Sequence, residues 1–233
     1  MLFFVGISNL LFVAFVGNLW PTHQLDAMQS EQALPYALLI NLVLLTLFGL
    51  QHSLMARSTF KQWLRQWLPQ GLERMIYNLS SAIVLLLLIY YWQAMPLVIW
   101  QAKAEWLRIG IYTVFFLGWF LSFVASNLID GFQLVGLRQL AIHFLERPEP
   151  STTFRTPTLY KMVRHPLYLG LLIAFWATPI MTLSHLLFAS GMTAYILIGI
   201  HYEEKDLLQR FGRQYQNYQR NTPKLFPKRL SLN

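Results

Sequence analysis

Long apolar runs with almost no charge inside them are the feature that most constrains what this chain can fold into. Inside a lipid bilayer the backbone of such a run can satisfy its own hydrogen bonds only as a helix or a closed barrel. Of the 233 residues, 55% are hydrophobic and 12% are charged, and the mean hydropathy is +0.41, which is too apolar for an ordinary soluble domain. The sequence predicts an all-α, polytopic integral membrane helix bundle with about five to six transmembrane helices. The runs are 2–20, 36–54, 75–92, 109–129, 166–178 and 186–200.

The distribution of charge predicts how these helices cross the membrane. Basic residues concentrate in 57–74, 138–164 and 205–229, whereas the loop after the first run holds Asp26 and Glu31 and no Lys or Arg. The excess of Lys and Arg in cytoplasmic loops places the three basic segments and both chain ends on the cytoplasmic side of the membrane. The net charge of +8 follows the same pattern, so we do not expect nucleic-acid binding. The short fifth run is either a full span or a buried arm of a hairpin.

The last two runs are expected to form a helical hairpin with polar groups at its ends. Pro166 suits the first turn of a helix, where its missing N–H is no loss, and His165 would be the capping residue. The N–H groups of 167–169 would then form an anion site at the positive end of the helix dipole. An antiparallel return brings 201–204 back level with Arg164 and His165, and Gly212 is the predicted end of the returning helix.

These residues carry a family resemblance. The pattern resembles the cofactor end of the isoprenylcysteine carboxyl methyltransferase superfamily, with Arg-His-Pro-x-Tyr-x-Gly at 164–170, the Glu-Glu to Tyr pattern at 203–218, and Pro223 with Pro227. The motifs at 51–57, 73–74, 132–139 and 176–179 are similar to one bacterial branch, which methylates methanethiol to dimethyl sulfide. The resemblance implies S-adenosylmethionine as methyl donor and a small thiol as acceptor. It also implies one domain over 1–233, with the acceptor side in 1–157 and the cofactor-binding hairpin and tail in 158–227.

The resemblance also assigns the donor site. Arg164 and the helix start would hold the carboxylate of S-adenosylmethionine, and Glu203 and Glu204 would meet its ammonium or ribose hydroxyls. A purely structural salt bridge of Glu203 or Glu204 with Arg164 is the alternative. Tyrosines at these positions either wall the adenine or are ordinary interfacial aromatics. The full set of expected cofactor-binding residues is Tyr160, Arg164, His165, Pro166, Tyr168, Leu169, Gly170, Glu203, Glu204, Tyr215 and Tyr218.

Methylation of a thiol needs a base, because the thiolate is the nucleophile. His52 is the first candidate, since histidine has a suitable pKa and lies here in a polar Gln-His-Ser patch at the end of the second run. The alternative for His52 is a hydrogen-bonded structural histidine. Asp130, Tyr168 and His201 are the other catalytic candidates, whereas His23 and His185 are expected to be uninvolved.

Other chemistries and functions stay open at this level. The chain has no cysteine, which excludes disulfides, cysteine-ligated zinc and a thiol nucleophile. His201 and Glu204, with His52 and His165, could in principle ligate a metal, but no HExxH or ExxH pair supports this, and we predict none. The alternative functions are methylation of a lipid-linked carboxylate or amine, a non-catalytic role in nitrogen-oxide metabolism, and solute transport. The oligomeric state is not predicted.

Overall fold

The computed structural model describes residues 2–20, 23–30, 32–68, 72–134 and 154–227, and side chains are described for all of these except residues 2, 58 and 129–134. Helices account for nearly all of the regular structure. Two short strands, β1 (Val98–Gln101) and β2 (Ile180–Thr182), are its β component. The helices are α1 (Leu2–Val16), α2 (Leu34–Ala56), α3 (Ser58–Leu64), α4 (Leu72–Tyr91), α5 (Glu105–Leu134), α7 (Thr158–Met162), α8 (Pro166–Trp176), α9 (Leu183–Phe211) and α10 (Arg213–Asn221). The predicted all-α membrane fold is confirmed.

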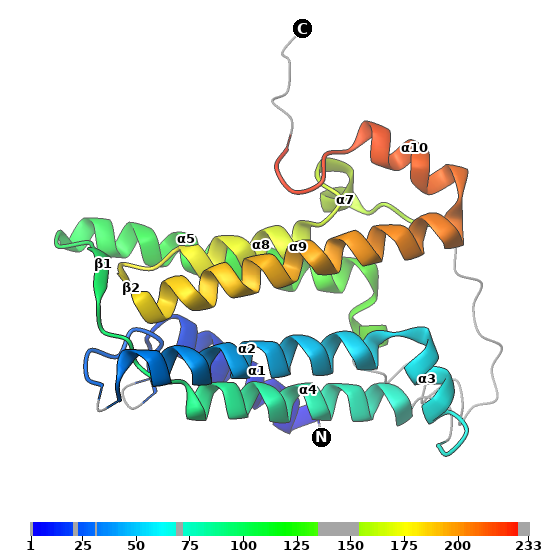
Figure 1. Cartoon of the computed structure of the whole chain (residues 1–233). Coiled ribbons are helices and arrows are strands. Elements are labelled where there is room, and N and C mark those ends of the chain that lie inside the picture. Colours follow the sequence, from blue (N-terminus) through cyan, green and yellow to red (C-terminus); the bar gives the residue numbers. More distant parts are fainter. Residues whose placement is uncertain (1, 21–22, 31, 69–71, 135–153, 228–233) are drawn as a thin grey trace, which may run out of the picture.

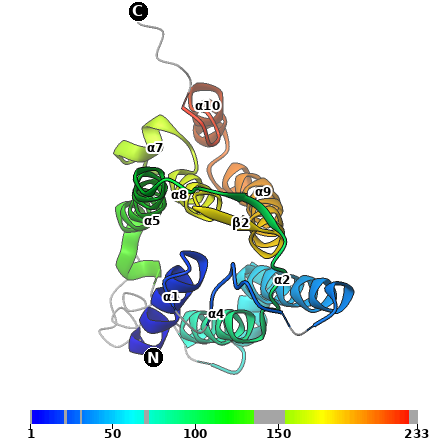
Figure 2. The same ribbon diagram turned by 90° about the vertical axis from the view of Figure 1, so that its left-hand side faces the viewer.

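Four of the described helices, α2, α4, α5 and α9, are long and apolar enough to cross a membrane. The first apolar run is helical only as far as Val16, and the fifth run forms an α8 of 11 residues. Both are therefore shorter than a typical full span of about 20 residues. The fifth run thus fits the expectation of a buried hairpin arm, since α8 packs along α5 and beside α9 (Figure 2).

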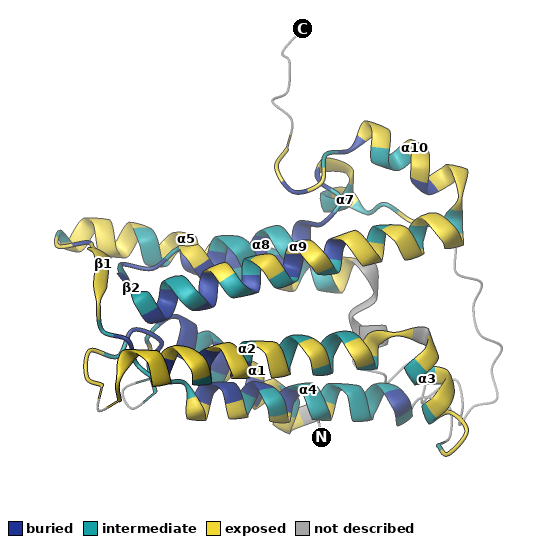
Figure 3. Cartoon of the chain, in the orientation of Figure 1, coloured by how far each residue is buried: buried dark blue, intermediate teal, exposed yellow. Residues whose placement is uncertain are grey.

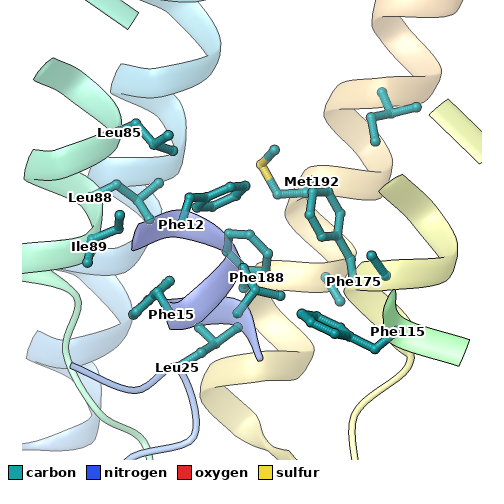
Figure 4. Packing of buried hydrophobic residues seen from close by; sticks show 14 of the residues in the cluster. Phe12, Phe15, Leu25, Leu85, Leu88, Ile89, Phe115, Phe175, Phe188 and Met192 are labelled. Carbon is teal, nitrogen blue, oxygen red and sulfur yellow. The ribbon is translucent and has the colours of Figure 1, made fainter. Parts of the chain in front are cut away.

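The helices lie in two layers, with α5, α8 and α9 in one and α1, α2 and α4 in the other (Figures 1 and 2). Aromatic side chains fill the space between the layers (Figure 4), with Phe12 and Phe15 from α1 meeting Phe175 of α8 and Phe188 of α9. The ring pairs are edge-to-face at centroid separations of 5.3–6.4 Å, which is the preferred arrangement for aromatic pairs.

Much of the outward side of the bundle helices is exposed (yellow in Figure 3), and many of the exposed residues are large and apolar. In water such a surface would be an aggregation site, but in a bilayer it faces lipid. The membrane environment therefore explains the exposure. The exposed residues on α2 and α5 include Leu38, Leu39, Leu42, Val43, Leu47, Leu50, Ile109, Val114, Phe116, Leu117, Phe120 and Phe123.

The two ends of the bundle differ. At one end, β1 pairs antiparallel with β2 and the loop after α1 folds against them; at the other lie α3, α7 and α10 with most of the basic residues (Figure 1). Both strands lie in the gaps that the sequence leaves between the apolar runs 75–92 and 109–129 and between 166–178 and 186–200, but their pairing was not predicted. The short strands satisfy backbone groups at the tip of the hairpin, where Leu183 N–H donates to the Leu97 carbonyl at 2.8 Å.

Candidate active site

The first turn of α8 is set by its proline, as predicted. Pro166 is the first helical residue and His165 is the capping residue. The Leu169 N–H donates to the His165 carbonyl at 3.0 Å, so this group is already used inside the helix. Of the three N–H groups expected at an anion site, those of Leu167 and Tyr168 come before this first bond.

Arg164 and Glu204 form a buried ion pair that joins the start of α8 to the end of α9. The Arg164 Nε donates to Glu204 Oε1 at 2.7 Å, and both side chains are only 11–12% exposed. Glu204 Oε1 also lies 3.0 Å from His165 Nε2, and Glu204 Oε2 accepts from Gln219 Nε2 at 3.4 Å. The predicted meeting of the cationic and acidic clusters is therefore present, and Glu204 is saturated with protein partners.

Glu203 is placed differently from its neighbour. Its carboxylate is 43% exposed and lies 3.9 Å from His165 Nδ1. It also interacts with the hydroxyl of Tyr168, whose ring lies against His165 at a centroid distance of 5.7 Å. Glu203 can therefore still accept hydrogen bonds from a ligand, whereas both carboxylate oxygens of Glu204 already have protein partners.

The chain after α10 closes over this cluster. Arg164 N–H donates to the Pro223 carbonyl at 2.8 Å, and His165 N–H to the Lys224 carbonyl at 3.1 Å. The Arg164 Nη1 donates to the carbonyls of Gln219 and Thr222 at 3.0 and 2.6 Å. Sequence reasoning missed this role of the tail, because backbone acceptors leave no residue-type signal.

Three of the expected cofactor-binding tyrosines lie outside the apolar helices and contact other protein groups: Tyr160, Tyr215 and Tyr218. The Tyr218 hydroxyl donates to the Tyr160 carbonyl, and the Tyr160 hydroxyl donates to the Ala125 carbonyl at 3.2 Å. Burial raises the pKa of Tyr218 to about 12, against the opposing effect of Arg164, so this phenol stays a donor. The Tyr215 ring is buried against Phe154, and its hydroxyl has no hydrogen-bond partner among the described residues.

Gly170 has a clear packing reason. A Cβ at Gly170 would lie 2.5 Å from the Gly118 carbonyl oxygen, and a Cβ at Gly118 would lie 2.7 Å from the Gly170 carbonyl oxygen. The two glycines let the α5 and α8 backbones approach closely. Gly170 thus fixes where the start of α8 lies.

A second polar cluster surrounds His52. The Tyr77 hydroxyl lies 2.6 Å from His52 Nε2, and Ser81 Oγ lies 3.4 Å from His52 Nδ1. Gln51 Nε2 donates to the same Ser81 oxygen at 3.2 Å, while Gln51 Oε1 is buried without a partner in the described part of the chain. Tyr77 and Ser81 were not predicted, although their four-residue spacing places two hydroxyls on one face of an otherwise apolar helix.

Aromatic rings connect the His52 cluster to the start of α8. Phe48 stacks on the His52 ring at 5.5 Å, and Tyr195 of α9 lies edge-on to it at 6.2 Å. The Tyr168 hydroxyl is within electrostatic range of the hydroxyls of Tyr77 and Tyr195. Tyr168 also interacts with Glu203, so its hydroxyl has electrostatic partners in both clusters.

His201 and Asp130 are the two remaining catalytic candidates. His201 is exposed and its ring contacts Tyr202. Asp130 lies in the last turns of α5, where its side chain is outside the described part. Within the described residues no group of three or more His, Asp or Glu could hold a metal ion.

A cavity of about 310 Å³ lies at the opposite end of the bundle. Its lining includes His23, Gln24, Gln29, Tyr90, Trp92 and Gln93. The cavity contains no residue of either cluster described above, so its volume does not mark the site where the charged residues converge.

Comparison with known proteins identifies the family. The chain is 46% identical over 224 residues to methanethiol S-methyltransferase 2 of Bradyrhizobium diazoefficiens, covering 95% of this chain and 85% of that one. It is 46% identical to methanethiol S-methyltransferase of Pseudomonas deceptionensis, over 91% of this chain and 80% of that one. The corresponding protein of Crocosphaera subtropica is 44% identical, over 92% and 84%. The chain belongs to the methanethiol S-methyltransferase family.

A family model described as NnrU protein matches residues 40–227 of this methyltransferase. The match includes both polar clusters. No solved structure matches the chain. Membership of the family makes the protein an integral membrane methyltransferase, and its reaction requires a methyl donor.

Proposed function

We propose that this enzyme transfers a methyl group from S-adenosylmethionine to methanethiol, giving dimethyl sulfide, at the cytoplasmic edge of the bacterial inner membrane. The observation that carries the proposal is the convergence of Arg164, His165, Glu203 and Glu204 at the start of α8, next to the His52 cluster. The names of the relatives support the acceptor, and the basic segments at this end of the bundle support the orientation.

The residues at the start of α8 fit the amino-acid end of the donor. The N–H groups of Leu167 and Tyr168 point from a helix start, which favours a carboxylate. Arg164 uses Nε and Nη1 for its bonds to the described protein groups, so Nη2 remains to assist. Glu203, with its half-exposed carboxylate, is placed to accept from an ammonium or a ribose hydroxyl. Glu204 positions Arg164 and His165, and it does not itself contact the donor.

When bound, S-adenosylmethionine supplies a sulfonium whose methyl group is open to attack by sulfur. The protein must align the acceptor sulfur with that methyl group, exclude water and remove the thiol proton. His52 is the proposed base, because it lies in the apolar region between α2, α4 and α9 with hydroxyl partners on both ring nitrogens. A buried thiol there would attack as a poorly solvated thiolate.

Headspace gas analysis tests the function directly. Purified protein with methanethiol and S-adenosylmethionine should release dimethyl sulfide, and omission of either compound should abolish it. Incubation of membranes with methyl-labelled donor is the companion measurement. Label in extracted lipid and no dimethyl sulfide would overturn the proposal in favour of a lipid-linked acceptor.

The role of His52 is tested by His52→Ala. Loss of a general base lowers turnover by roughly 10²- to 10⁴-fold, so we expect a loss in that range with calorimetric affinity for S-adenosylmethionine unchanged. His23→Ala, at the opposite end of the bundle, is the matched control and should keep wild-type turnover. A His52→Ala enzyme that works at the wild-type rate would remove this residue as the base.

A further inference from the structure

Both nitrogens of the His52 ring are already occupied by protein hydroxyls. Tyr77 Oη lies 2.6 Å from Nε2 and Ser81 Oγ lies 3.4 Å from Nδ1. An acceptor thiol therefore has no free nitrogen to contact. If His52 is the base, the proton must reach it through one of these hydroxyls.

The hydrogen bonds around Ser81 indicate which group donates and which accepts in each bond between Ser81, His52 and Tyr77. Ser81 Oγ accepts from Gln51 Nε2 at 3.2 Å and has a second lone pair for the His52 Nδ1–H. Its own proton can go to Tyr77 Oη, with which it also interacts. His52 Nε2 is then an acceptor for the Tyr77 O–H. In this arrangement the three groups form a closed ring that delivers a proton from Tyr77 to the imidazole.

Tyr77 is also the member of the ring that has electrostatic partners on α8 and α9. Its hydroxyl is within electrostatic range of Tyr195 on α9 and of Tyr168 on α8. Tyr168 interacts in turn with Glu203, the proposed donor contact. The ring contacts point the same way: Tyr195 of α9 lies edge-on to the His52 ring at 6.2 Å, and the Tyr168 ring lies 5.7 Å from that of His165 at the start of α8. The acceptor sulfur must lie between these two clusters to reach both the donor and the base.

We propose that Tyr77 is a catalytic residue that contacts the acceptor thiol and relays its proton to His52. The inference rests on the proposed function. The S–H bond of the thiol breaks as its proton moves to Tyr77 Oη, while the Tyr77 proton moves to His52 Nε2. The thiol sulfur forms the new bond to the methyl carbon, and the electron pair of the broken sulfonium–methyl bond stays on the donor sulfur. His52 ends as an imidazolium and later releases the proton to water.

The test compares Tyr77→Phe with wild type on two acceptors. Methanethiol must be deprotonated by the enzyme, whereas 2,2,2-trifluoroethanethiol is small and far more acidic, so it arrives largely ionised at mildly alkaline pH. We expect Tyr77→Phe to lose roughly 100-fold or more in turnover with methanethiol and to recover most of that loss with the acidic thiol. Its rate with methanethiol should also rise steeply with pH, as the supply of free thiolate grows. Tyr112→Phe in α5, which removes a hydroxyl that donates to the Gly17 carbonyl just after α1, is the matched control and should behave as wild type on both thiols.

Other results would overturn the relay. The relay is rejected if Tyr77→Phe turns over methanethiol at the wild-type rate. It is also rejected if the variant loses the same factor in turnover with both thiols, because a merely structural role of Tyr77 would slow both reactions equally. If Tyr77→Phe does not fold, fluorinated tyrosines at position 77 keep the shape and acidify the phenol; rates that do not change with fluorination also reject the proposal. If the wild-type protein forms no dimethyl sulfide, the proposed function fails first and the relay fails with it.

Discussion

The two ends of the α8–α9 hairpin use similar residues in different ways. At the tip, Asp26 and His185 form a buried pair that is at most 2% exposed, with Nδ1 2.7 Å from Oδ2. At the open end, Glu204 meets Arg164 and His165, and the neighbouring Glu203 carboxylate is 43% exposed. Residue type alone does not separate a structural pair from a ligand site; exposure and remaining hydrogen-bond capacity do.

The pair at the tip is closed to ligands because each of its polar atoms has a protein partner. Asp26 accepts from Asn18, from the N–H and hydroxyl of Thr182, and from His185. His185 Nε2 lies 2.8 Å from the Phe175 carbonyl. Both ring nitrogens of His185 therefore face acceptor oxygens of the protein. The pair ties the loop after α1 to the hairpin.

The largest predicted effect is on stability at the tip. Asp26→Ala removes one partner of a buried pair and leaves its donors unsatisfied, which typically costs about 3–5 kcal/mol. We expect a large fall in the thermal unfolding temperature in detergent, with little change in affinity for S-adenosylmethionine in the protein that remains folded. Asp206→Ala removes an exposed carboxylate of α9 and should leave stability unchanged. An Asp26→Ala protein as stable as wild type would show that the Asp26–His185 pair does not hold the loop after α1 to the hairpin.

The next effect concerns binding at the open end. Glu204→Ala and Arg164→Ala each leave the other charge partly buried and unpaired, and loss of one member of such a pair typically costs about 2–5 kcal/mol. We expect calorimetric binding of S-adenosylmethionine to become undetectable in both variants while the protein still purifies folded. Lys205→Ala, on an exposed face of α9, is the control. Unchanged donor affinity in both variants would reject the assignment of the donor site.

Much of this comparison could be predicted from the sequence, and the reasons for the rest are physical. Pro166, Gly212 and the apolar runs fixed the helices because their effects are local. The meeting of Arg164 with Glu204 followed from an antiparallel hairpin.

What could not be predicted depended on tertiary packing. His185 and Asp26 lie far apart in the sequence, and only the fold brings them together. The Gly118–Gly170 approach and the hydroxyls beside His52 depend on which helix faces pack, and a single sequence does not specify those faces.

A smaller effect separates the two neighbouring glutamates. Glu203→Gln keeps the shape but removes a charge-assisted acceptor, a bond worth about 1.5–3 kcal/mol. We expect a loss of donor affinity of at least tenfold, corresponding to the lower end of that range at about 1.4 kcal/mol per factor of ten. The unfolding temperature should not change, because the side chain is half-exposed. A lower unfolding temperature with unchanged affinity for S-adenosylmethionine would instead show that Glu203, like Glu204, acts by holding protein groups in place and not by contacting the donor.

The smallest expected effect is a change in stability with pH. Burial alone would raise the pKa of Asp26, but the hydrogen bond and charge of His185 together with the Thr182 donors outweigh it, so the pKa lies below the ordinary 3.8. A carboxyl whose pKa is lowered by folding stabilises the protein above its unfolded pKa and loses that contribution as the pH falls through the folded one. The stability difference between wild type and Asp26→Asn should therefore not shrink between pH 7 and pH 5, and it should fall only below about pH 4. A difference that already shrinks between pH 7 and pH 5 would mean that Asp26 becomes protonated in that range, which would contradict a carboxyl whose pKa is held below its ordinary value by its partners at the tip.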